Sequence, residues 1–239
     1  MRILPAHATK NNPLLLYPVP PPLTQTLQLT QNSLAATTTG ATLWLGAQVL
    51  TAYLYTLYTP SSASNKLALD LGAGIGLASL ALGALGFEVT ATDVAELAGP
   101  GGLLRGNIES PKNSTAGRVS VRELDWFQPP PREELLVGGK EFDVVMTADT
   151  IYAPELVVPL FETITRFAGA KTQVWIALEV RDEELIRGAL KTAQEMGFGV
   201  KKIQQGKLKK AMAAARIEWG AEDWAGVEVW KLNVGKRKE

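Results

Sequence analysis

One stretch of the chain restricts the possible folds more than any other. A short apolar run at 67–71 is followed directly by three alternating glycines within 72–76. An apolar run of this length predicts a buried strand, and the glycines predict a turn whose backbone can approach a ligand closely. A helix is expected at 76–85 and a second strand at 87–92, which leads into Asp93. The stretch therefore predicts a strand–helix–strand unit with a ligand site at its first turn.

Strands and helices alternate along most of the remaining chain. Apolar residues at helical spacing predict a helix within 40–58, ahead of the first strand. Further strands are expected at 118–124, 142–148, 173–180, 198–204 and 227–234, and further helices at about 95–108, 154–168, 182–196 and 207–215. This alternation predicts an α/β fold, a mostly parallel sheet with helices on both faces. The last strand alternates between apolar and polar residues, so we expect it to run antiparallel.

The first 38 residues differ from the rest because they are rich in proline. Proline lacks the backbone donor that helices and strands use, so an extended arm is expected over 1–38, ahead of a single domain at 39–239. Within the arm, the alternation at 24–30 predicts a short strand or hairpin. The arm is either loosely held or wrapped around the domain.

The composition excludes several kinds of function. Basic and acidic residues balance at 24 each, so nucleic acid contact is expected only indirectly, if at all, and membrane contact is not expected. The chain has no cysteine and one histidine, His7, which excludes thiolate chemistry, disfavours a histidine triad and predicts no metal site. No long apolar run or signal-peptide pattern occurs, so we expect a monomeric cytoplasmic protein, with the nucleus left open as a second location.

The glycine turn indicates which ligand is bound. A dinucleotide fingerprint needs glycine at the sixth position of its motif, where this chain has Leu77. Asp70, two residues before Gly72, can receive a cationic amino group, and Asp93 can accept both hydroxyls of a ribose. S-adenosylmethionine, a nucleoside that carries an amino acid, suits both carboxylates. A purely structural turn is the alternative interpretation.

The residues Leu69 to Gly76, together with Asp93, resemble the first motif and the following acidic residue of class I S-adenosylmethionine-dependent methyltransferases. The resemblance implies a Rossmann-like, doubly wound sheet of seven strands in the order 3-2-1-4-5-7-6, with strand 7 antiparallel. It also implies that Gly72, Ala73 and Gly74 bind the cofactor.

Four further segments are similar to the protein-lysine methyltransferases of the methyltransferase-like group. They are a Gly…Trp segment at 39–44, a Leu-x-x-Asn-Ile helix at 103–108, an Asp-Trp pair at 125–126 and an Asp-x-x-Tyr motif at 149–152. Residues 149–152, 160–163 and Arg181 look most like a fungal branch that methylates a lysine of a ribosomal protein. The resemblance implies a protein substrate, and a ribosomal one in that branch.

The remaining site residues take roles beside this cofactor. Asp125 can accept from the adenine amino group, and Trp126 can cover the ring. Trp44, on the early helix, can close over the cofactor. The resemblance also implies that Ala148, which precedes Asp149, contacts the cofactor.

Asp149 follows an apolar strand and is therefore expected at the carboxyl end of the sheet, where open α/β sheets bind ligands. We expect Asp149 to orient the ammonium of the incoming lysine, and Tyr152 to pack on its stem. Methylation of a small-molecule amine and a non-catalytic binding module are the alternatives at this point. A nicotinamide reductase is disfavoured by Leu77 and by the lack of a Tyr-x-x-x-Lys proton donor.

Overall fold

The computed structural model describes residues 2–34 and 39–234. Its centre is a seven-stranded sheet in the order β5-β4-β3-β6-β7-β9-β8, in which only the pairings of β9 are antiparallel. The strands are β3 (Leu67–Leu71), β4 (Glu88–Asp93), β5 (Val119–Glu123), β6 (Val144–Ala148), β7 (Gln173–Glu179), β8 (Gly199–Lys202) and β9 (Val227–Asn233). Numbered along the chain, this order is 3-2-1-4-5-7-6, and the predicted doubly wound α/β fold is confirmed.

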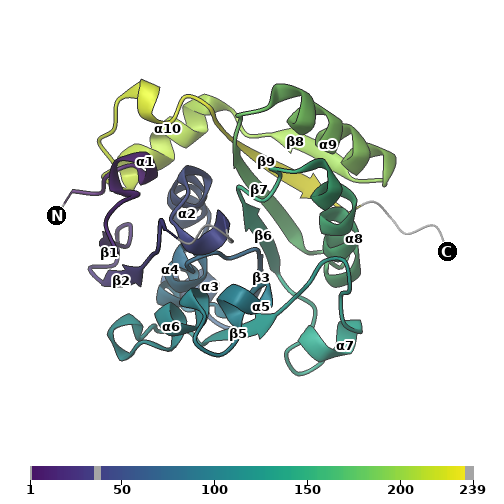
Figure 1. Cartoon of the computed structure of the whole chain (residues 1–239), viewed down its shortest axis with the longest axis horizontal. Coiled ribbons are helices and arrows are strands. Elements are labelled where there is room, and N and C mark those ends of the chain that lie inside the picture. Colours follow the sequence, from purple (N-terminus) through teal and green to yellow (C-terminus); the bar gives the residue numbers. More distant parts are fainter. Residues whose placement is uncertain (1, 35–38, 235–239) are drawn as a thin grey trace.

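Helices cover both faces of the sheet (Figure 1). One face carries α2 (Leu45–Leu57), α4 (Leu77–Leu85) and α10 (Gln205–Ala214); the other carries α8 (Val157–Phe167) and α9 (Glu183–Glu195). Each face of the sheet has its own hydrophobic core, and β3 contributes to both. Successive side chains of a strand point to opposite faces, so Ala68 lies in the core under α2 and α4, whereas Leu67 and Leu69 lie in the core under α8 and α9. A strand buried on both faces must be apolar throughout, which explains the unbroken run in the sequence.

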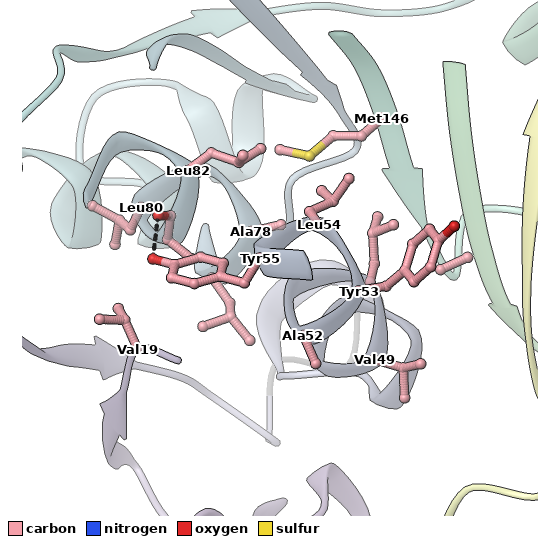
Figure 2. Close-up of a cluster of buried hydrophobic side chains, with 14 of the residues drawn as sticks. Val19, Val49, Ala52, Tyr53, Leu54, Tyr55, Ala78, Leu80, Leu82 and Met146 are labelled. Carbon is pink, nitrogen blue, oxygen red and sulfur yellow. Dashed lines mark hydrogen bonds between the residues drawn. The ribbon is translucent and has the colours of Figure 1, made fainter. Parts of the chain in front are cut away.

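Helix α2 is buried on nearly all sides (Figure 2). Its residue Tyr55 donates a hydrogen bond of 2.7 Å to the Ala81 carbonyl of α4, and Val19 of the N-terminal segment lies on the same side. On the sheet side, Tyr53 packs edge-on against Trp175, with ring centroids 5.4 Å apart. These contacts hold α2 rigidly, which matters because its first residues enter the candidate site.

The expectation of an extended N-terminal arm is wrong for much of its length. It contains a short helix, α1 (Ala6–Thr9), and an antiparallel hairpin of β1 (Leu14–Pro18) and β2 (Thr26–Thr30). The hairpin predicted at 24–30 is thus present. Apolar side chains of the arm join those of the domain in one core, so the arm is wrapped around the domain. The division between 38 and 39 stays a prediction, since residues 35–38 lie outside the described residues.

The helix expected at 95–108 is interrupted. The structure has α5 (Ala95–Ala98) and α6 (Leu103–Glu109), separated by Gly99–Gly102, where Gly101 has a φ of 79°. The helix expected within 40–58 begins only at Leu45, after a 3₁₀ turn at Thr39–Ala41. Besides α1, two further short helices were not expected, α3 (Pro60–Ala63) and α7 (Arg132–Leu135). No helix in the described part of the chain is both long and apolar enough to cross a membrane.

Candidate cofactor and acceptor site

A cavity of about 500 Å³ opens at the carboxyl ends of the parallel strands. This is the edge at which open α/β sheets bind their ligands. Every residue that the sequence nominates for the site lines this one cavity: Trp44, Asp70, Gly72, Ala73, Gly74, Asp93, Asp125, Trp126, Ala148, Asp149 and Tyr152. The fold thus brings together residues that come from four different strand ends and from the position just before α2.

The glycine turn has a backbone that other residues adopt at a cost. Gly72, Gly74 and Gly76 have φ values of 69°, 57° and 89°, in the left-handed region. A methyl group at Gly72 would also lie 2.7 Å from Cγ2 of Thr150. The turn therefore presents bare backbone to the cavity, as a closely bound ligand requires.

Asp93, the last residue of β4, forms a hydrogen bond with the glycine turn. Its Oδ2 accepts a hydrogen bond of 2.8 Å from the Gly74 amide, and its Oδ1 accepts one of 2.8 Å from the Val94 amide. A carboxylate has about four acceptor positions, so both oxygens can still accept from a ligand. Burial raises the pKa of Asp93, although the two amides oppose this. The residue thus combines a fixed orientation with unused acceptor capacity.

Asp70 is the penultimate residue of the buried strand β3, and only 3% of its surface is exposed. The hydroxyl of Ser79 donates to its Oδ2 at 2.7 Å. Burial, helped by the nearby charge of Asp93, raises its pKa to about 7, against the lowering effect of the hydrogen bonds from Ser79. A buried carboxyl that no cation neutralises is costly for the fold. A cationic ligand at this point of the cavity would remove that cost.

Asp149 joins three elements. It follows β6 with a φ of 57°, unusual for a residue other than glycine. Its Oδ1 accepts from the Glu179 amide at 2.8 Å, and its Oδ2 from the Gly46 amide at 2.7 Å. A methyl group at Gly46 would lie 2.5 Å from that oxygen, so glycine is required there. Burial raises the pKa of Asp149 to about 6.

These contacts assign Asp149 a task that the sequence did not predict. Through its two hydrogen bonds it connects the first turn of α2 to the ends of β6 and β7. Each carboxylate oxygen keeps a further acceptor position, so the predicted contact with an incoming lysine is compatible with this geometry.

Trp44 precedes α2 and lies at the cavity. Its Nε1 donates to the Thr39 carbonyl at 2.7 Å, and the guanidinium of Arg181 stacks on its ring, 4.3 Å from the centroid. Arg181 also forms an ion pair with Glu179. Tyr152 is 54% exposed, and its ring is therefore accessible to a partner. These side chains form an aromatic and cationic part of the lining.

Several lining residues were not nominated from the sequence. Thr150 faces Gly72, and its hydroxyl is 2.7 Å from that of Thr147. Val94 and Phe127 are exposed apolar residues directly after Asp93 and Trp126. Their positions after strand ends would have identified them, but threonine, valine and phenylalanine have no distinctive chemistry. The roles of the nominated residues stay predictions.

The sheet order, the glycine turn and the acidic residue at the end of β4 define a class I methyltransferase fold. Among solved structures, the chain is similar to that of SMU.776, described as a putative methyltransferase complexed with SAH. The TM-score is 0.55 at 13% sequence identity, over 93% of this chain and 56% of that one. Such a low identity supports the fold alone.

The sequence comparisons are more specific. The profile of a family described as lysine methyltransferase matches residues 23–188, and the chain belongs to this family. It is 31% identical to the protein-lysine methyltransferase METTL21E of Bos taurus over 150 residues, which cover 61% of this chain and 49% of that protein. It is 29% identical to the human protein-lysine N-methyltransferase EEF2KMT over 161 residues, 62% of this chain and 47% of that protein. The chain thus spans about half the length of these relatives.

Proposed function

We propose that this chain is an S-adenosylmethionine-dependent methyltransferase that methylates the side-chain amine of a lysine in a protein. One observation carries the proposal. The same cavity is lined by a glycine turn with two carboxylates, which suit the cofactor, and by Asp149 and Tyr152, which suit an amine. Membership in the lysine methyltransferase family and the names of the relatives support the choice of lysine.

The residues of the turn fit this cofactor. Gly72 and Gly74 line the cavity with backbone in the left-handed region, which suits the close approach of an amino-acid portion of the ligand. Asp70 is a buried carboxyl whose pKa is raised to about 7, and an α-ammonium group beside it would restore its charge. Asp93, held by two amides, offers further acceptor positions to ribose hydroxyls. Asp125 and Trp126 are proposed to hold the adenine, by accepting from its amino group and by stacking.

The reaction needs alignment more than acid–base machinery. When bound, the cofactor would supply a methyl group on a sulfonium; a neutral amine attacks that methyl carbon in line, and the sulfur leaves as a thioether. The tasks of the chain are then to hold the lysine nitrogen on the line of attack and to exclude water. Asp149 is proposed to accept a hydrogen bond from that nitrogen, and Tyr152 to pack along the lysine stem. The proton of the lysine leaves to solvent.

The proposed substrate is a translation-related protein, and in particular a ribosomal protein. The support is the resemblance of 149–152, 160–163 and Arg181 to the branch that methylates such a protein. A cytoplasmic location, with the nucleus as a second site, and a monomeric state fit this proposal.

The proposal is tested by adding the purified protein and methyl-labelled S-adenosylmethionine to an extract of cells that lack its gene. We expect label in one protein band, recovered as methyllysine after hydrolysis and enriched in the ribosomal fraction. Asp149→Ala is expected to abolish the label. Glu155→Ala serves as the matched control, because this nearby acidic residue is exposed and does not line the cavity.

Three outcomes would contradict parts of the proposal. Label that enters only the small-molecule fraction would replace the protein substrate with a metabolite. Equal labelling by the wild-type protein and Asp149→Ala would refute the acceptor site. Failure of the wild-type protein to bind S-adenosylmethionine in calorimetry would refute the enzymatic function.

A further inference from the structure

Two buried asparagines hold the N-terminal hairpin against the domain. Asn107 in α6 and Asn113 shortly after it are 3% and 2% exposed. Asn107 Oδ1 accepts from the Thr30 amide at 2.8 Å, and its Nδ2 donates to the Thr30 carbonyl at 2.9 Å. Asn113 makes the same pair of contacts with the amide and carbonyl of Gln28, each at 2.8 Å. The two side chains thus occupy the free edge of β2 in place of a neighbouring strand.

The two asparagines differ in one contact. The second Nδ2 hydrogen of Asn107 is donated at 2.9 Å to the carbonyl of Ile75, in the middle of the glycine turn. The corresponding hydrogen of Asn113 is donated at 2.8 Å to the backbone carbonyl of Asn107. Only Asn107 therefore joins the hairpin directly to the turn that lines the cavity.

Two other backbone amides of the turn are held by β4. The amide of Ala73 donates to the Thr92 carbonyl of β4, and that of Gly74 donates to Asp93. Inside the turn, the Gly76 amide donates to the Ala73 carbonyl. The peptide between Ile75 and Gly76 is thus held at its carbonyl by Asn107. Gly76, with a φ of 89°, leaves the backbone free to adopt other conformations, so this contact restricts a peptide that glycine alone would not fix.

We propose that Asn107 is a positioning residue for the cofactor turn and that it couples the N-terminal hairpin to cofactor affinity. The inference rests on the proposed function, because it takes the turn to be the cofactor site. Fixing the Ile75 carbonyl fixes the backbone on either side, which includes Gly74, the partner of Asp93. Loss of the Asn107 donor frees that carbonyl and allows the turn to sample conformations in which the cofactor binds less well.

The matched pair Asn107→Asp and Asn113→Asp tests this. Each change keeps the side-chain shape, removes two donated hydrogen bonds and affects one residue of β2, so we expect similar losses of stability in urea unfolding. Calorimetry with S-adenosylhomocysteine separates the two variants. The Kd should rise about tenfold for Asn107→Asp and stay within about twofold of the wild-type value for Asn113→Asp. Equal Kd values in the two variants would overturn the proposal.

A second measurement needs only the wild-type protein. Coupling free energies are reciprocal, so a ligand that orders the turn must stabilise the hairpin through Asn107. We expect hydrogen exchange at the Thr30 amide, followed by NMR, to slow when S-adenosylhomocysteine is bound at saturation. Unchanged exchange at this amide would overturn the coupling. If the ligand does not bind the wild-type protein at all, the proposed function fails instead, which distinguishes the two failures.

Discussion

Replacing Asp70 by asparagine is expected to make the protein more stable above neutral pH and to weaken its binding of the cofactor. The reason is that Asp70 is a buried carboxyl with 3% of its surface exposed, and its charge has no function in the fold itself. Asparagine has nearly the same shape as the protonated acid, and its oxygen can still accept from the Ser79 hydroxyl.

The magnitude follows from the pKa of Asp70. Burial raises this pKa from an ordinary 3.8 to about 7, against the opposing effect of the Ser79 hydrogen bond. The difference of about 3 units between the folded and the unfolded pKa, at about 1.4 kcal/mol per unit, corresponds to about 4 kcal/mol in the free energy of unfolding. The folded state binds this proton more tightly than the unfolded chain does. The contribution of Asp70 to the free energy of unfolding is therefore largest below about pH 4 and falls until about pH 7.

Urea unfolding of the ligand-free wild-type protein and Asp70→Asn at two pH values measures this effect. Below about pH 4 the two proteins should have similar stability, and at about pH 8 the variant should be more stable by about 2–4 kcal/mol. All other titrating groups are the same in both proteins, so their contribution drops out when one free energy of unfolding is subtracted from the other. Asp125→Asn, a change at an exposed carboxylate of the same cavity, is the control and should show no such gain.

The same variant should bind S-adenosylmethionine about tenfold to a hundredfold more weakly, because the proposed contact between the Asp70 carboxylate and the ammonium of the cofactor is lost. The reasoning about Asp70 is refuted if the stability difference is the same at both pH values. It is also refuted if Asp70→Asn is the less stable protein at about pH 8.

Three further predictions concern the same cavity. Asp93→Ala should raise the Kd for S-adenosylhomocysteine about a hundredfold, measured by calorimetry, because the proposed acceptors for the ribose hydroxyls are lost and the Gly74 amide loses its partner. Tyr152→Phe should keep most of the methylation activity, whereas Tyr152→Ala should lower kcat/KM about tenfold at unchanged cofactor Kd; equal losses in both variants would point to the hydroxyl. Asp149→Asn should lower the free energy of unfolding by about 1–3 kcal/mol, since one amide donor then faces the backbone amide of Gly46 or Glu179. An unchanged urea midpoint would contradict that role.

The sequence was most informative where one chemical requirement acts over a few neighbouring residues. The unbroken apolar run of β3, the left-handed glycines after it and the acid at the end of β4 are all local features, and they predicted the site at that turn. The interruption at Gly99–Gly102 is also local, because glycine and proline disfavour a helix wherever they occur. The helical periodicity on either side nevertheless predicted one continuous helix.

The N-terminal arm shows the opposite case. Its prolines predicted an extended segment, yet α1 and the hairpin are packed into the core of the domain. Burial of side chains such as Leu27 and Leu29, both fully buried, stabilises this arrangement, and local propensity has no information about the surface that buries them.

By itself, the amino-acid sequence determined the α/β class, the position of the cavity at the carboxyl ends of the strands and the residue types that line it. Only the tertiary structure decided which backbone groups those residues hold. Asp149 pins the first turn of α2, and Asn107 joins β2 to the Ile75 carbonyl. The partners in these contacts are 32 to 103 residues apart in the chain, and they are peptide groups, which every residue has. No sequence pattern can therefore name them; the packing of helices on the sheet selects them.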